Sequence, residues 1–218
     1  MSEDCFPRLR WLALAWVAVY LPSYTLAYGL ANFLFLCNLT VFLVAIGIWT
    51  CNRLLLSSQA VAILVIGTLW TVDFVSRILT GSHLIGGTEY MWEPQWPLFT
   101  RVLSLYHVIL PVLLIAILRR IGYDRRGYLL QSAIALALVL VGRLLGPELN
   151  INHAYVDPVL KKTWGGAVTH VAVIVGALVG VVYPLTHVLL VKVCPGEGAW
   201  PQRKKTARIR AAKPSGNT

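Results

Sequence analysis

The sequence has few charged residues, and acidic residues are especially scarce. Only 13% of its 218 residues are charged, 57% are hydrophobic, and the mean hydropathy is +0.69. A soluble domain usually has about 25% charged and about 45–50% apolar residues. This composition therefore excludes an ordinary soluble enzyme and a disordered chain. Nine acidic residues stand against 19 lysine and arginine residues, which gives a net charge of +10.

Cysteine is also scarce, and its spacing carries no known signature. The four cysteines are Cys5, Cys37, Cys51 and Cys194, with no CxxC pair and no Cys/His metal spacing. A disulfide framework or a zinc site usually shows such a pattern. We therefore expect no disulfide, no metal site and no cofactor. His83, Glu89, His153 and Asp157 of the predicted external loops could converge on a metal, but no spacing supports that alternative.

The chain consists largely of long apolar segments. Hydropathy predicts six membrane spans, at Trp11–Tyr28, Leu30–Cys51, Ala60–Thr80, Pro97–Leu118, Tyr128–Leu145 and Gly166–Val191. Six spans of ~20 residues occupy ~120 residues, which leaves little for a soluble domain. The predicted fold is an all-α bundle of six transmembrane helices. A signal peptide is the alternative for the first span, but the apolar run is long for one and a second span follows almost at once.

The distribution of positive charge predicts that both termini lie in the cytoplasm. With the N-terminus inside, 14 lysine and arginine residues are cytoplasmic and 5 lie on the outer side, as the positive-inside rule requires. The predicted parts are a cytoplasmic N-terminus (1–10), a membrane domain (11–194) and a basic, disordered cytoplasmic tail (195–218). The tail would bind anionic lipids of the inner leaflet of the plasma (inner) membrane. This location explains the positive charge without nucleic acid, and nothing indicates an oligomeric state.

Polar residues inside the predicted spans share one depth in the membrane. A charged group in a span costs ~2.5–3.5 kcal/mol on insertion scales, so each one needs a partner or a function. The residues in the outer halves of the spans are Cys37, Asn38, Asp73, Arg77, Arg101, Ser104, His107, Arg143, Thr169 and His170. We expect the inner halves to be apolar except for Thr50 and His187. The shared depth predicts a polar cavity in the outer half of the membrane.

Helical spacing groups some of these residues further. Asp73 and Arg77 are four residues apart and are expected to form an ion pair within one helix. Arg101 and Ser104 share a stripe with His107 on its flank. Pro111 lies four residues after His107 and should leave the carbonyl of His107 free. Gly176 and Gly180 have the spacing of a close helix-packing surface.

A thiol and a histidine at one depth predict acyl chemistry on a lipid. A thiol needs a base to be reactive at neutral pH, so Cys37 is the predicted nucleophile and His107 the predicted base, with His170 as its competitor. Asp73 or Asn38 would orient the base, and Arg101 would hold an oxyanion or an anionic head group. The remaining predicted substrate-binding residues are Arg77, Ser104, Arg143 and His170. The substrate would enter from lipid, so hydrolysis or transfer of a lipid ester is the predicted reaction.

Two segments invite a comparison with a known family. Phe35-Leu36-Cys37-Asn38 and Ser104-Leu105-Tyr106-His107 resemble the pattern of the six-span intramembrane hydrolases of the androgen-induced gene family. They are also similar to the related transmembrane cysteine acyltransferases and their uncharacterised bacterial relatives. Those families combine a Thr or Cys on an early span with a His on a later one. The resemblance implies a reaction class, acyl hydrolysis or acyl transfer, and no particular substrate.

Two other functions use the same residues differently. A small transporter or permease component would use Asp73, Arg77, His107, Arg143 and His170 as a polar pathway. It requires polar groups that continue from His107 toward Thr50 and His187. A lipid-binding or assembly protein without catalysis requires neither that continuity nor a reactive Cys37.

Overall fold

In the computed structural model, which describes residues 5–194, all regular elements of the described part are helical. The predicted tail 195–218 lies outside the described residues. The α-helices are α1 (Leu9–Tyr28), α2 (Leu36–Trp49), α3 (Arg53–Thr80), α4 (Leu98–Leu103), α5 (Tyr106–Ile121), α6 (Gly127–Leu144), α7 (Ala167–Ala177) and α8 (Tyr183–Val193). Three short 3-10 turns are η1 (Leu30–Leu34), η2 (Glu89–Trp92) and η3 (Ile151–His153), and the π-helical turn η4 (Leu178–Val182) joins α7 to α8. The all-α class predicted from hydropathy is confirmed.

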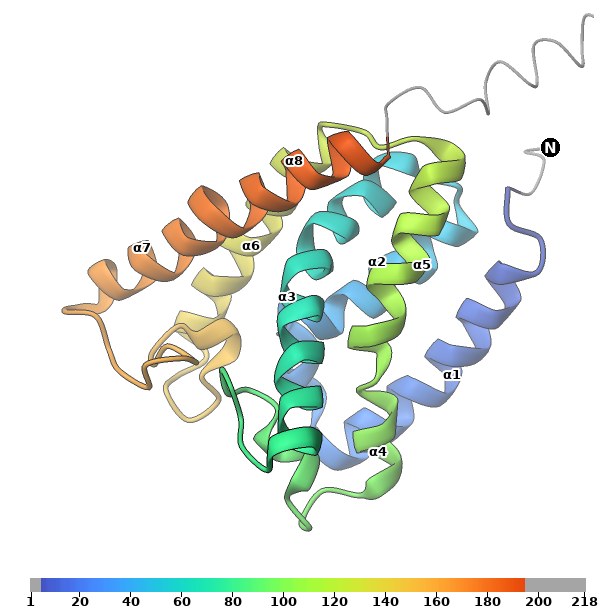
Figure 1. The fold of residues 1–218 in the computed structure, drawn as a ribbon. Helices are drawn as coiled ribbons and strands as arrows, with labels where there is room; N and C mark the ends of the chain where they lie inside the picture. Colours follow the sequence, from blue (N-terminus) through green and yellow to red (C-terminus); the bar gives the residue numbers. More distant parts are fainter. Residues whose placement is uncertain (1–4, 195–218) are drawn as a thin grey trace, which may run out of the picture.

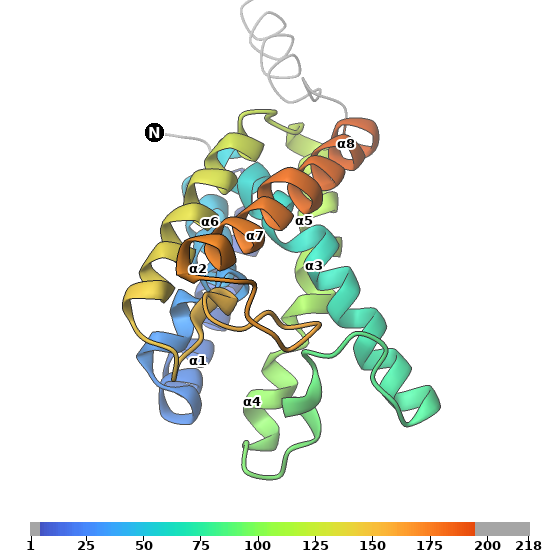
Figure 2. The same cartoon turned by 90° about the vertical axis from the view of Figure 1, so that its left-hand side faces the viewer.

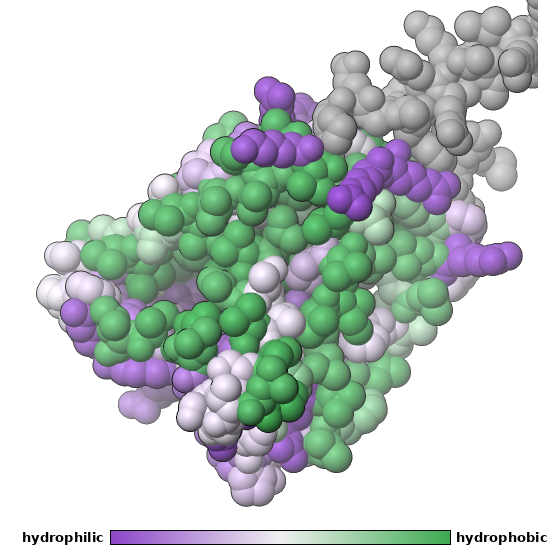
Figure 3. Space-filling view, in the orientation of Figure 1, coloured by the Kyte–Doolittle hydropathy of each residue, from purple (hydrophilic) through white to green (hydrophobic). Residues whose placement is uncertain are grey.

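Five helical segments of the described chain are long and apolar enough to cross a membrane. They are Leu9–Tyr28, Arg53–Thr80, Leu98–Ile121, Gly127–Leu144 and Ala167–Val193. These segments mark the chain as a multi-pass membrane protein by length and composition. On the face in Figure 3, hydrophobic side chains cover most of the surface, and hydrophilic ones gather toward the two ends of the bundle.

The predicted second span is shorter than hydropathy suggested. Its helix α2 has only 14 residues, about 21 Å at 1.5 Å per residue, whereas the hydrocarbon core is about 30 Å thick. The side chain of Asn152, from the loop after α6, interrupts this segment. Its Oδ1 accepts from the N–H of Leu36 at 2.8 Å, and its Nδ2 donates to the carbonyl of Leu34 at 2.8 Å. Asn152 thus satisfies the backbone where η1 and α2 fail to form one helix.

The helix ends separate into two groups (Figures 1 and 2). The start of α1, the α2–α3 turn, the α5–α6 loop and the end of α8 lie at one end of the bundle. We call this the arginine-rich end, because Arg8, Arg53, Arg120 and Arg126 belong to those segments. The three long connections, after α1, α3 and α6, lie toward the other end, called here the loop end. The predicted orientation would place the arginine-rich end in the cytoplasm.

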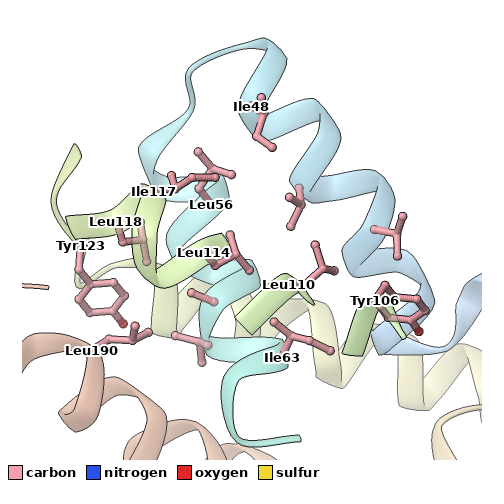
Figure 4. Packing of buried hydrophobic residues seen from close by; sticks show 14 of the residues in the cluster. Ile48, Leu56, Ile63, Tyr106, Leu110, Leu114, Ile117, Leu118, Tyr123 and Leu190 are labelled. Carbon is pink, nitrogen blue, oxygen red and sulfur yellow. The ribbon is translucent and has the colours of Figure 1, made fainter. Parts of the chain in front are cut away.

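Helix α3 packs against α2, α5, α6 and α8. Aliphatic side chains fill the space between these helices, among them Ile48, Leu56, Ile63, Leu110, Leu114 and Ile117 (Figure 4). A glycine allows the closest approach of α3 to α5: a Cβ at Gly67 would lie 2.7 Å from the carbonyl oxygen of His107. Gly67 therefore fixes the position of the helix that carries His107.

Two expectations about small and sulfur-containing residues are wrong. Cys5 and Cys51 form a disulfide that ties the segment before α1 to the α2–α3 turn, with their Cα atoms 5.9 Å apart. Their separation of 46 residues has no sequence signature. At Gly176 and Gly180, no heavy atom of the described chain lies within 4 Å of a Cβ position. These glycines therefore do not mediate packing within this part of the chain.

Candidate functional site

A buried hydrogen-bond network joins three helices near the loop end. The Oδ1 atom of Asn38 on α2 accepts from the hydroxyl of Tyr20 on α1 at 2.9 Å and from the hydroxyl of Tyr106 on α5 at 2.7 Å. Its Nδ2 donates to the carbonyl of Asn32 at 2.7 Å. Both hydrogen bonds that the side-chain oxygen of Asn38 accepts come from tyrosine hydroxyls. Asn38 therefore holds Tyr20 and Tyr106 in place, and it does not orient His107 as predicted.

The tyrosines of α1 are site residues that the sequence analysis missed. Tyr20, Tyr24 and Tyr28 are four residues apart, so they share one helix face. The hydroxyls of Tyr24 and Ser104 lie 2.5 Å apart, and Ser104 also donates to the carbonyl of Thr100 at 3.3 Å. The four-residue spacing was the available signal: Tyr24 and Tyr28 meet α4 and its C-terminal end, and Tyr20 meets the start of α5.

His107 is held in a single tautomer. Its Nδ1 lies 2.9 Å from the carbonyl oxygen of Ser104. A carbonyl can only accept, so Nδ1 carries the proton and Nε2 keeps its lone pair. The imidazole stacks on Trp70, with ring centroids 4.8 Å apart, and on Tyr106, with centroids 4.1 Å apart. Among the described residues no group is hydrogen-bonded to Nε2, and this atom, unlike Nε1 of Trp70, is not fully buried.

The neighbouring indole of Trp70 carries an unpaired donor. Its Nε1–H is buried and has no well-aligned acceptor in the described part of the chain. The hydroxyl of Tyr90 on η2 lies near Ser104 and Trp70. Burial raises the pKa of Tyr90 above its ordinary value, and these two neighbours only partly oppose the rise. Tyr90 is therefore a neutral hydroxyl at neutral pH. The stack thus presents an unpaired acceptor on His107 and an unpaired donor on Trp70.

Asp73 lies with a loop rather than with Arg77 or His107. Its Oδ1 accepts from the N–H groups of Ile85 and Gly86, at 2.7 and 3.0 Å. Its Oδ2 lies 2.5 Å from the hydroxyl of Thr88 and 3.0 Å from Nδ1 of His83. The expected pairing of Asp73 with Arg77 is therefore absent from the described contacts. Four loop donors satisfy the carboxylate more completely than one half-buried guanidinium on the same helix could.

The predicted arginines contact loops and aromatic rings. The guanidinium of Arg77 lies over the Trp92 ring, 5.8 Å from its centroid. Arg101 donates from Nη1 to the carbonyl of Met91 at 2.8 Å. Arg143 donates to the carbonyl of Ala154 at 3.2 Å and lies 3.8 Å from the centroid of the Tyr155 ring. These contacts anchor the two loops at the loop end.

His170 differs from His107 because both of its ring nitrogens are occupied. Its Nδ1 accepts from the N–H of Trp164 at 3.1 Å, and its Nε2 donates to the carbonyl of His153 at 2.9 Å. A histidine held in this way has no free lone pair to accept a proton. Of the two predicted bases, only His107 keeps one.

The described contacts do not bring Cys37 and His107 together. The thiol of Cys37 lies 4.0 Å from Oδ1 of Asn38 and beside the hydroxyl of Tyr106. Tyr106 also stacks on His107, so this tyrosine contacts both members of the predicted dyad. The predicted direct contact between thiol and imidazole is not among these interactions.

A second polar cluster lies toward the arginine-rich end, and its member Gln131 contradicts the expectation of an apolar inner half in the predicted span Tyr128–Leu145. Nε2 of Gln59 on α3 lies 2.9 Å from the hydroxyl of Ser58 and 3.4 Å from Oε1 of Gln131 on α6. Nε2 of Gln131 lies 3.4 Å from the hydroxyl of Tyr183 on α8. Ser57 also accepts from the N–H of Asp124 at 2.9 Å. This cluster joins α3, α6 and α8 on the side of the arginine-rich end.

An apolar layer separates the two clusters. Figure 4 shows Tyr106 and Tyr123 at opposite ends of a run of aliphatic side chains, which includes Ile63, Leu110 and Leu114. Tyr123 is hydrogen-bonded to His187, with its hydroxyl 2.8 Å from Nδ1. In the described chain, the polar groups near His107 therefore do not continue to His187.

Comparison with models of protein families, with curated proteins and with solved structures gives no match for this chain.

Proposed function

We propose that this multi-pass membrane protein binds the polar group of an amphipathic lipid at the stacked rings of Trp70 and His107. The observation that carries the proposal is the unpaired donor of Trp70 beside the unpaired acceptor of His107. A buried polar group without a partner costs about 1–3 kcal/mol. A ligand that accepts from the buried N–H of Trp70 would recover this free energy, and the lone pair of His107 would accept a second hydrogen bond from it.

The two missing partners define the ligand chemistry. The ligand must accept from the indole N–H and donate to the imidazole Nε2. A hydroxyl or a protonated carboxyl group does both, whereas an ester only accepts. The aromatic stack that runs from His107 through Trp70 and Phe74 to Trp92 provides apolar surface beside these groups. A long-chain alcohol or fatty acid therefore fits this site best.

A matched ligand pair tests the proposal. We expect the purified protein in detergent to bind radiolabelled tetradecanol more tightly than methyl tetradecanoate, which lacks the donor. His107→Phe keeps a stacked ring but removes the acceptor, so it should abolish this preference. Trp70→Phe should lower the affinity for both ligands about tenfold, equivalent to about 1.4 kcal/mol. His187→Phe, a histidine outside the site, is the control. Equal binding of the two ligands to wild type would refute the proposal.

Acyl hydrolysis or acyl transfer is the second candidate function. It is favoured by the thiol of Cys37 beside Tyr106, which contacts His107, and by the family resemblance described above. In this reaction the thiolate attacks an ester carbon, a thioester forms, and His107 passes the thiol proton to the departing alcohol. Water or a second alcohol then releases the acyl group. Cys37→Ala and His107→Ala should each abolish turnover of a lipid ester while the protein stays folded, and full turnover in either variant would exclude the dyad.

A further inference from the structure

An apolar groove lies between α1 and α2, away from the Trp70–His107 site. Its volume is about 210 Å³. Its walls are Leu14 and Val17 of α1 and Phe42, Ala45 and Ile46 of α2. On each helix these residues recur every three or four positions, so one stripe of α1 faces one stripe of α2. The two helices pack against each other.

Aromatic rings close the groove at the end that lies toward the loop end of the bundle. The ring of Phe42 packs against Tyr20 and Phe33, with centroids 5.9 and 5.2 Å away. Seven residues separate Arg10 from Val17, so the groove is about 10 Å long at 1.5 Å per residue. One leaflet of hydrocarbon is about 15 Å thick, half of the core. The groove therefore has the length of a partial acyl chain within a single leaflet.

The open end of the groove lies at the arginine-rich end and is lined by Arg10 and Trp49. The guanidinium of Arg10 lies over the rings of Trp11 and Trp49, 5.6 Å from each centroid. Indole rings with an adjacent arginine are typical of the membrane–water interface. Arg8, two residues before Arg10 in the chain, is exposed. Two arginines therefore lie at this mouth, and the wall behind it is apolar.

We propose that this groove binds one acyl chain of an anionic phospholipid, with the lipid phosphate at Arg8 and Arg10. The apolar walls match the chain, the closed end sets its depth, and the basic mouth complements the phosphate. Each basic residue near an anionic head group contributes about 1 kcal/mol, which is about a fivefold change in affinity. This proposal does not depend on the function proposed for the Trp70–His107 site.

A comparison of two head groups on identical chains tests the proposal. Dioleoylphosphatidylglycerol and dioleoylphosphatidylcholine are titrated into the delipidated full chain in detergent, and bound lipid is counted by native mass spectrometry. Wild type should bind one phosphatidylglycerol about tenfold more tightly than phosphatidylcholine. Arg10→Gln should reduce this preference about fivefold. Ala45→Phe fills the groove and should abolish the tight site, whereas Ala137→Phe, at an exposed position on α6, should leave it intact.

A second measurement covers the case in which Ala45→Phe fails to fold. A phosphatidylglycerol with a diazirine in mid-chain is photolysed on wild-type protein, and the labelled peptides are identified. Labelling concentrated on Leu14–Val17 and Phe42–Ile46 supports the proposal. Labelling spread evenly over the exposed helices, or equal binding of the two lipids by wild type, would overturn it.

Discussion

Replacing Asn38 with leucine is the sharpest test of the buried network near the loop end. The substitution removes three hydrogen bonds, two accepted from Tyr20 and Tyr106 and one donated to the carbonyl of Asn32. A hydrogen bond inside a membrane protein contributes ~0.6 kcal/mol on average, and a typical buried one about 1 kcal/mol. We therefore expect Asn38→Leu to lower the free energy of unfolding by about 2–4 kcal/mol.

The assay is thermal unfolding in detergent followed by intrinsic fluorescence. For a chain of this size, 1 kcal/mol corresponds to about 2–4 °C in Tm, so the expected loss is about 4–16 °C. Cys37→Ala, on the same turn of α2 but without a strong hydrogen bond, should shift Tm much less.

A triple variant separates the network from simple packing loss. Tyr20→Phe and Tyr106→Phe each remove a hydroxyl that Asn38→Leu leaves without an acceptor. Removing both partners of a hydrogen bond is nearly neutral, whereas removing one is costly. The triple variant should therefore be more stable than Asn38→Leu alone. A triple variant that is less stable than Asn38→Leu would contradict the assignment of these residues to one hydrogen-bonded unit.

Two further predictions concern close packing and charge. Gly67→Ala places a methyl group against the carbonyl of His107 and should destabilise the protein by about 1–3 kcal/mol, whereas Gly180→Ala, which faces open space, should leave Tm unchanged in the same unfolding assay. Asp124 lies in the loop between α5 and α6, outside the spans, and hydrogen bonds from Arg126 hold the pKa of its carboxyl group below the ordinary value. A carboxyl group whose pKa is lower in the folded state stabilises the fold at pH values above its unfolded pKa of about 3.9. This stabilisation is lost as the pH falls through the folded pKa. Asp124→Asn should therefore lower Tm at pH 7 by more than at pH 3, and an equal difference at both pH values would contradict this.

The sequence predicted the helical class and the positions of the long spans because hydropathy is additive along a chain. It did not predict the interruption of Leu30–Cys51, because the side chain responsible, Asn152, lies more than 110 residues further on. The same limit applies to Asp73. Its neighbour on the helix, Arg77, is visible in the spacing, but its actual partners come from a loop whose conformation the spacing does not encode.

The predicted polar residues Asn38, Asp73 and His107 lie toward the loop end, whereas the polar residues near the arginine-rich end were missed. The charged residues and histidines stood out, since ionisable groups are expensive in lipid. Ser57, Ser58, Gln59 and Gln131 are uncharged, and they satisfy one another across helices. Ser57, Ser58 and Gln59 also lie before the predicted span Ala60–Thr80, because hydropathy placed its start later than the helix, which begins at Arg53. The tautomer of His107 likewise depended on a backbone carbonyl that only the folded chain supplies.

The disulfide between Cys5 and Cys51 gives the predicted membrane orientation an independent, chemical readout. Disulfides persist in oxidising compartments, whereas cytosolic glutathione and thioredoxin keep thiols reduced. The predicted orientation would place the end that carries this pair in the cytosol, where a disulfide would be reduced, so the charge distribution and the disulfide predict different compartments for this end. In living cells, the N-terminal segment is then tied to the α2–α3 turn only when the surrounding thiol pool becomes oxidised, or else this end faces outward. Labelling these two thiols from either side of an intact membrane would therefore report topology and redox state in one experiment.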